Sequence, residues 1–150
     1  MTKECSCSES TITRYQKRIS GPLLDRIDIF VEVPRVEYDK LSSDAMGEPS
    51  RTVRERVEAA RSVQTERFAG TRFICNAEMT PTEVRQHCQS RLDEQAQSLL
   101  RLAMAQLSLS ARSFHRVLKL ARTIADMAEA ETISSHHLEE AIQYRQRTRG

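Results

Sequence analysis

The sequence predicts a mainly α-helical fold, in which a bundle of four or five helices follows one shorter helix and one short strand. Three observations predict this class. Apolar residues recur every three or four positions along several long segments. Helix start signals precede most of these segments. The 150-residue chain has only four glycines, four prolines and no tryptophan, which favours long helices over a turn-rich β fold.

The composition indicates a soluble protein. Net charge is +2, which is too small to indicate nucleic-acid binding by itself. No apolar run approaches the ~20 residues that span a bilayer, and the start of the chain does not resemble a signal peptide. We therefore expect a cytoplasmic protein without a membrane partner. Its four cysteines are then expected to be thiols rather than disulfides.

The N-terminal segment predicts a helix, a turn and a strand. A helix is expected over residues 8–19, with Ile12, Tyr15 and Ile19 on one apolar stripe. A Ser-Gly-Pro turn follows at residues 20–22. Residues 27–33 alternate charged and apolar types and are rich in β-branched residues, which predicts a strand that Pro34 ends.

Arg26 stands where the turn becomes the strand, between Asp25 and Asp28. An arginine at such a corner can project a planar, permanently charged group from a rigid base, which suits phosphate and the charge that develops in phosphoryl transfer. The alternative is that Arg26 pairs with Asp25 or Asp28 and only holds the corner in place.

Cys5 and Cys7 are spaced so that they could share a metal ion, but a tetrahedral zinc site needs two more ligands. Cys75 and Cys88 could supply them only if the fold brought them close. Half of a four-ligand site rarely holds metal. We therefore predict no metal site, and Cys5 and Cys7 are either half of a larger site or plain surface thiols.

Residues 34–50 are predicted to be a linker, because so long a loop is unusual within one compact domain. Ser50 then caps a helix over residues 51–69 that Gly70 ends. Its expected buried stripe consists of Val53, Val57, Ala60, Val63 or Gln64, and Phe68. Arginines at 51, 54, 56 and 61 alternate with glutamates, which indicates a solvated face.

Two more helices are expected before residue 107. Thr80-Pro81-Thr82-Glu83 predicts a helix start with a capping box. This short helix continues or breaks near Ser90, and a helix over 91–106 follows. The stripe of the second helix consists of Leu92, Ala96, Leu99, Leu100 and Ala103.

The helix over residues 111–129 is the most informative. Ser110 caps it, and it carries a broad apolar face. Arg112, Arg116 and Lys119 share a stripe on the opposite side. A cation in the first helical turn opposes the helix dipole, and helix N-termini attract phosphate, so Arg112 indicates an anionic partner. The alternative is a solvated basic face.

A last helix is predicted over 134–147, with Ile133 and Leu138 as a hydrophobic staple. His136 and His137 are adjacent and are predicted to be surface residues. The sequence contains no Gly-x-x-x-x-Gly-Lys-Ser/Thr loop and no apolar run that ends in paired acids for magnesium. The chain is therefore expected to be catalytically inactive by itself.

Three segments resemble one family: residues 18–36 (RISGPLLDRIDIFVEVPRV), residues 109–126 (LSARSFHRVLKLARTIAD) and residues 137–145 (HLEEAIQYR). They are similar to the magnesium-chelatase-related AAA+ ATPases of the ComM/YifB-like group, of which the chain matches only the C-terminal part. The resemblance implies a remnant of the α/β core over 1–35, a linker over 36–50, and the helical lid over 51–150.

The resemblance also implies a mechanism. AAA+ subunits form rings, usually hexamers, with ATP and Mg²⁺ at each interface in the full-length parent. Arg26 matches the arginine finger that acts on the neighbouring subunit's ATP. Arg112 matches the sensor-2 arginine of its own subunit, with Arg116 as the alternative. The implied role is DNA remodelling in uptake and recombination, or magnesium insertion in a chelatase. The competing hypotheses are an ATP-independent helical module that binds nucleic acid or protein, and a purely structural lid.

Overall fold

The computed structural model describes residues 6–34, 36 and 46–145. Within these residues the chain is helical and contains no strand, so the mainly α-helical class is confirmed. The α-helices are α1 (Glu9–Gln16), α2 (Gly21–Leu24), α4 (Ser50–Arg67), α5 (Pro81–His87), α6 (Glu94–Gln106), α7 (Ala111–Met127) and α8 (Ser135–Gln143). Two short 3-10 helices, η1 (Asn76–Glu78) and η2 (Gln89–Arg91), flank α5.

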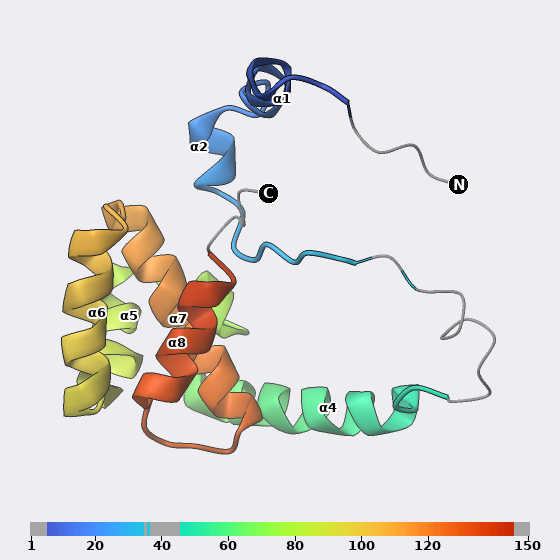
Figure 1. The fold of residues 1–150 in the computed structure, drawn as a ribbon. Helices are drawn as coiled ribbons and strands as arrows, with labels where there is room; N and C mark the ends of the chain where they lie inside the picture. Colours follow the sequence, from blue (N-terminus) through green and yellow to red (C-terminus); the bar gives the residue numbers. More distant parts are fainter. Residues whose placement is uncertain (1–5, 35, 37–45, 146–150) are drawn as a thin grey trace.

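Helix α7 is the centre of the bundle (Figure 1), because it packs against α8, α4, α5 and η1. The core consists of small and medium apolar side chains from α5 to α8 and the end of α4: Phe68, Met79, Val84, Cys88, Leu92, Ala96, Leu100, Ala103, Val117, Leu118, Ala121, Ala125, Ile133, Leu138, Ala141 and Ile142. A single bridge between Leu92 and Ile133 joins the segments that precede α6 and α8. Within it, the Ile133 N–H donates to the Arg91 carbonyl at 2.7 Å.

Side-chain caps mark the starts of α2, α5, α6, α7 and α8, whereas the predicted Ser50 cap was wrong, because Ser50 is the first residue of α4. The backbone N–H of Thr80 donates to Oε2 of Glu83 at 2.9 Å, which confirms the predicted capping box. Ser110 accepts from the Ser113 N–H at 3.1 Å, as predicted. Gly70 has φ of 78°, a left-handed conformation that glycine adopts readily, and it lies in the turn that follows the end of α4 at Arg67. Asp93, which caps α6, was not predicted, so the start of α6 at residue 91 was wrong by three residues.

The predicted strand over residues 27–33 was wrong. These residues have no regular secondary structure, because a strand needs a neighbour for its backbone hydrogen bonds and none of the described residues supplies one. One ladder-like bond is present, from the Phe30 N–H to the Tyr144 carbonyl at 2.8 Å. The predicted Ser-Gly-Pro turn forms the start of α2, where Ser20 caps the helix and Pro22 lies in its first turn.

Two predicted apolar stripes are only partly buried. In α4, Ala60, Gln64 and the following Phe68 are buried, whereas the three valines on the predicted stripe, Val53, Val57 and Val63, remain about two-fifths exposed. Figure 1 shows the reason: the N-terminal half of α4 extends beyond the other helices. In the α1 region, Tyr15 is 72% exposed and Ile19 44% exposed.

Most of the predicted linker lies outside the described residues. Among the residues that are described, none of the helices has both the length and the apolar character needed to cross a bilayer.

Candidate functional site

The segment Asp25–Phe30, here called the corner, lies against the start of α7 and the end of α8. Apart from turn bonds to the residues of α2, its hydrogen bonds within the described part of the chain reach only these two helices. The contacts join residues that are more than 80 positions apart in the sequence. The corner is therefore held by the helical bundle and not by a sheet.

Asp25 makes the most contacts within the corner. Its Oδ1 accepts from the Ser113 hydroxyl at 2.6 Å and from the Ser110 hydroxyl at 3.1 Å. The guanidinium of Arg145 donates to the Ser113 hydroxyl at 2.7 Å and lies 3.5 Å from Oδ1 of Asp25. The Ser113 hydrogen bond, then the Ser110 bond and the charges of Arg145 and Arg112, lower the pKa of Asp25 against the opposing effect of burial. A carboxylate is thus held at the positive end of α7.

The backbone of the corner accepts hydrogen bonds from two arginines of the bundle. Arg116 of α7 donates to the Arg26 carbonyl at 2.6 Å and forms an ion pair with Asp28. Arg145, which follows α8, donates to the Ile27 carbonyl. Its side chain is only 8% exposed, and its Nε is buried without a hydrogen-bond partner among the described residues.

The three predicted site residues differ in how they are engaged. The Arg26 side chain is exposed and donates to the Pro22 carbonyl at 2.6 Å, so it pairs with neither Asp25 nor Asp28. Arg112 is exposed and makes no hydrogen bond or ion pair with the described residues, although its charge acts on Asp25. Arg116 is engaged by the corner. The structure thus places all three around the junction between the corner and α7.

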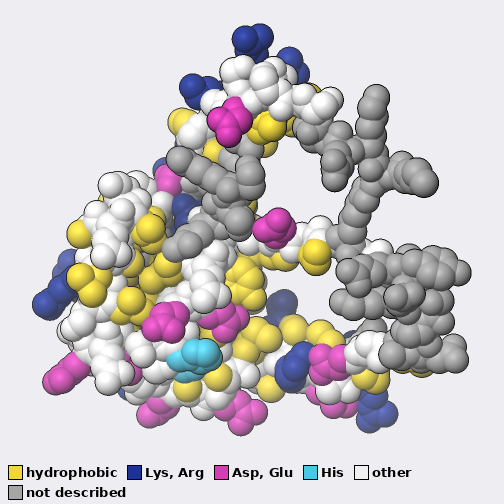
Figure 2. Space-filling model, viewed as in Figure 1, with side chains coloured by type: hydrophobic (Ala, Val, Ile, Leu, Met, Phe, Trp, Pro, Cys, Tyr) yellow, Lys and Arg dark blue, Asp and Glu magenta, His cyan; other side chains and the backbone are white. Residues whose placement is uncertain are grey.

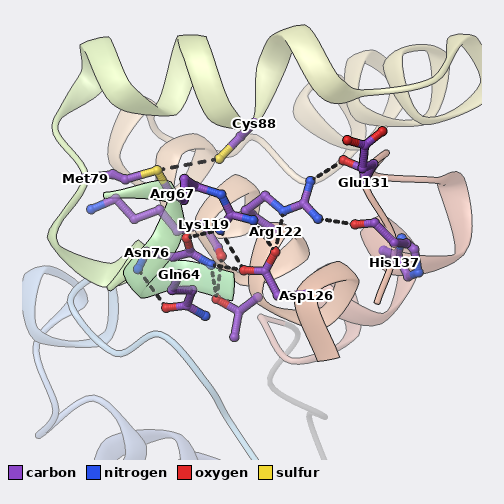
Figure 3. A network of polar contacts seen from close by, with 12 residues as sticks. Gln64, Arg67, Asn76, Met79, Cys88, Lys119, Arg122, Asp126, Glu131 and His137 are labelled. Carbon is purple, nitrogen blue, oxygen red and sulfur yellow. Dashed lines mark hydrogen bonds and ion pairs between the residues drawn. The ribbon is translucent and has the colours of Figure 1, made fainter. Parts of the chain in front are cut away.

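A second polar cluster is buried between α4 and α7 (Figure 3). Asp126 accepts from Nη2 of Arg67 at 2.5 Å, from Nε of Arg122 at 3.0 Å and from Nδ2 of Asn76 at 2.7 Å. Arg122 is 2% exposed, and it also donates to the carbonyls of Ala130 and Glu131, which ties the end of α7 to the loop before α8. A pocket of about 610 Å³ lies beside this cluster. The charged groups are paired, which is the condition for burying them.

The basic stripe predicted on α7 is only partly a solvated face. Lys119 donates to the Ala77 carbonyl of η1 at 2.8 Å, and burial lowers its pKa. Arg116 contacts the corner, so Arg112 is the member of the stripe that remains open. The stripe therefore connects α7 to two neighbouring segments.

The cysteines show no shared site among the described residues. No group of three or more potential metal ligands occurs there, and Cys5 lies outside them. Cys88 is fully buried in the core, and burial raises the pKa of its thiol to about 12. Its sulfur lies 4.0 Å from that of Met79. Cys88 is thus a core residue.

Basic side chains also gather over α1, at the top of Figure 2. Arg14, Lys17 and Arg18 are exposed there, and Arg18 lies 5.8 Å from the centre of the exposed Tyr15 ring. On α4, Arg51 pairs with Glu55 and Arg56 with Glu48, as the alternating charges indicated.

Several residues of both clusters were not singled out from the sequence. Asp25 was considered only as a partner for Arg26, and Ser113 and Arg145 were given no role. Ser110 and Ser113 at the first turn of a helix were a signal in the sequence, because two hydroxyl groups there favour a nearby hydrogen-bond acceptor such as a carboxylate. The spacing of Arg122 and Asp126, four residues apart on the apolar face of α7, was a second signal. His137 was predicted to lie on the surface, but it is half-buried and its Nδ1 accepts from the Ser134 N–H at 3.2 Å, which is a capping contact.

A helical bundle is the arrangement that the resemblance implies for the lid of a magnesium-chelatase-like AAA+ protein. The comparisons agree: residues 47–145 match the family described as magnesium chelatase, subunit ChlI C-terminal, and residues 1–41 match magnesium chelatase, subunit ChlI. The chain belongs to this magnesium chelatase-like family, which is related to the AAA+ ATPases.

Individual relatives extend this assignment. The chain is 40% identical over 139 residues to competence protein ComM of Haemophilus influenzae, covering 92% of this chain and 26% of the relative. It is 39% identical over 140 residues to YifB of Escherichia coli, covering 93% and 26%. An uncharacterized protein of Mycobacterium tuberculosis is 33% identical over 144 residues, covering 96% and 28%. The chain therefore spans about a quarter of the length of these relatives.

Proposed function

We propose that this chain is the C-terminal part of a ring-forming ATPase, in which Arg26 acts on the ATP of the neighbouring subunit and Arg112 contacts the ATP of its own. The upstream part of the full-length protein would supply the phosphate-binding loop and the residues that hold Mg²⁺. Membership in the AAA+-related family supports this assignment, and the further roles rest on the geometry of the corner.

The proposal rests on which arginines are already paired with a carboxylate and which are not. Of the three predicted site arginines at the junction, Arg116 is paired with Asp28, whereas Arg26 and Arg112 have no acidic hydrogen-bond partner among the described residues. Two exposed guanidinium groups beside a helix N-terminus can donate to phosphate oxygens without first breaking an ion pair. This favours Arg112 over Arg116 as the contact to the nucleotide.

Substitution of Arg26 tests its role. In a full-length protein that includes this chain, Arg26→Ala should leave ATP affinity nearly unchanged and reduce hydrolysis by roughly 10³–10⁵-fold, the contribution of an arginine finger. Arg54→Ala, which removes an exposed arginine from α4, is the matched control. Unchanged turnover in Arg26→Ala would refute the assignment.

Mixed rings test whether Arg26 acts across the interface. Arg26→Ala subunits mixed with subunits that cannot bind ATP should regain hydrolysis, because the second kind supplies an intact Arg26 to a neighbour that still binds ATP. Without recovery, Arg26 does not act in trans.

For Arg112, we expect Arg112→Ala to change ATP affinity or hydrolysis in the same full-length protein, since it removes a cation next to the phosphates. Wild-type values for both quantities would remove Arg112 from the site.

We propose that the motor acts on DNA. The exposed basic residues of α1 and the stacked pair of Arg18 and Tyr15 favour a nucleic-acid contact, because arginine and aromatic rings contact phosphates and bases. Salt-sensitive binding of DNA without any ATP-dependent effect on DNA by the full-length protein would support the binding-module hypothesis instead. ATP-dependent magnesium insertion into a porphyrin, without any effect on DNA, would favour the chelatase hypothesis.

A further inference from the structure

The backbone around Arg26 is held by the helical bundle, whereas the Arg26 side chain is not. Among the described residues, the Arg26 side chain has one hydrogen bond, to the Pro22 carbonyl of its own turn. The backbone around it is instead fixed from the bundle, by Arg116 at the Arg26 carbonyl and by Arg145 at the Ile27 carbonyl. The direction of Arg26 therefore depends on where α7 and α8 lie.

Asp25 is the side chain that connects these two parts most directly. It precedes Arg26 in the chain, and both hydroxyls that it accepts from, those of Ser110 and Ser113, belong to the first turn of α7. Arg145 donates to the same Ser113 hydroxyl, so Ser113 links the carboxylate to a guanidinium that is more than nine-tenths buried. Arg112, the proposed contact to the nucleotide, lies between the two serines in the sequence.

We propose that Asp25 is a positioning residue that makes the direction of Arg26 follow the position of the first turn of α7. The inference rests on the proposed function. When Arg112 engages a phosphate, the first turn of α7 shifts with it, and the two serines carry Asp25 along. Because Arg26 is the next residue, the nucleotide state of one subunit is thereby transmitted to the site that Arg26 serves in its neighbour.

The first experiment uses the 150-residue chain. Asp25→Asn retains the size of the side chain and removes its charge, so the hydroxyl contacts weaken and residues 26–30 should gain backbone motion in ¹⁵N relaxation measurements. Glu32→Gln is the matched control, because it removes one exposed carboxylate from the same segment. Unchanged relaxation of residues 26–30 in Asp25→Asn would overturn the inference.

The second experiment uses the full-length protein. Asp25→Asn should lower kcat by roughly 100-fold, as expected for a misplaced group near the reacting atoms. Its affinity for ATP should stay within about twofold of wild type, since a purely positioning role leaves ground-state binding intact. Asp25→Glu should restore part of the rate, because it keeps the charge.

Mixed rings separate positioning from simple destabilisation. An Asp25→Asn subunit should fail when it supplies Arg26 to a neighbour and should function when it receives Arg26 from a wild-type subunit. Equal loss in both positions indicates a structural role and overturns the inference. Ser113→Ala, which removes the linking hydroxyl without a change in charge, should reproduce the pattern and replaces Asp25→Asn if that variant does not fold.

The two proposals fail in different ways. Normal turnover in Arg26→Ala would refute the proposed function whatever Asp25 does. Lost turnover in Arg26→Ala together with wild-type turnover in Asp25→Asn would refute only the positioning role of Asp25.

Discussion

Asp126 shows how much one buried carboxylate holds together in this fold. It accepts hydrogen bonds from Arg67 of α4, from Arg122 of α7 and from Asn76 of η1. Burial lowers the pKa of Arg122 and its neighbour Asp126 raises it, so the pair compensates part of the cost of removing the charge from water. The network therefore joins three elements at a point where an apolar core would be expected.

Removing the charge of Asp126 should be severely destabilising. In Asp126→Asn, the guanidinium groups of Arg67 and Arg122 lose the one carboxylate that they contact among the described residues, and we expect the free energy of unfolding to fall by about 3–5 kcal/mol. Urea denaturation of the 150-residue chain measures it. Glu58→Gln on the exposed side of α4 is the control and should change stability by less than about 0.5 kcal/mol. A loss as small as the control's would show that the network does not stabilise the fold.

The contacts of single residues were also the feature that the sequence predicted least well. Arg26 and Arg112 were identified from their positions at a corner and at a helix start, and both lie at the junction. Asp25, Ser113 and Arg145 were not assigned to a site. They lie far apart in the sequence, and no local pattern predicts a contact between them. The buried network depends in the same way on the approach of α4 to α7.

Helix α8 depends on its first turn. Ile133 and Leu138 are both fully buried, and His137 accepts from the Ser134 N–H, so the helix start combines an apolar contact with a polar one. Burial, followed by the charge of His136, lowers the pKa of His137 below its ordinary value of 6.5. A protonated imidazole cannot accept the capping hydrogen bond.

The stability of the chain should therefore depend on pH through His137. A lowered pKa in the folded state gives stability that is present above pH 6.5 and is lost as pH falls from 6.5 through the folded-state pKa. His137→Gln, which can accept at the same position without titrating, should reduce the slope of stability between pH 7 and about 5. Urea denaturation at several pH values measures the slope. His115→Gln on α7 is the control, and an equal reduction in both variants would contradict the capping role.

Elements with local start signals were the easiest to predict. The capping box at Thr80, the cap at Ser110 and the glycine at 70 are all observed, since each depends only on neighbours in the chain. The strand over 27–33 failed for the opposite reason: its alternating pattern requires a pairing partner that the described residues do not contain. The buried stripe of α4 failed at Val53 and Val57, because a periodic pattern does not indicate how far a neighbouring helix extends.

At the scale of the whole molecule, the core lies between Phe68 and Ile142, and none of its members precedes α4. The residues before α4 contribute the corner, whose contacts are mostly polar and partly exposed. The division into segments 1–35, 36–50 and 51–150 stays a prediction. Because the core contains no residue that precedes α4, a fragment without the N-terminal segment can test this division directly.

A fragment comprising residues 47–150 should fold without the N-terminal segment. We expect a cooperative thermal transition by circular dichroism, with a melting temperature reduced by about 4–8 °C for each kcal/mol that the corner contributes. Asp25→Asn in the intact chain should lower the melting temperature in the same direction but by less, since it removes only part of the corner. A fragment without a cooperative transition would show that the helical region is not an independent unit.

The hydrogen bond between Phe30 and Tyr144 has a geometric consequence for the whole lid. The polypeptide enters the bundle at Pro49, before α4, and it also touches the bundle near the far end of α8, a distant place in Figure 1. A body attached at one point can swivel in any direction, whereas a body attached at two separated points can only pivot about the line that joins them. Because Asp25 and Arg26 also contact α7, the bundle is held at more than two places and cannot swivel about Pro49 while these contacts last.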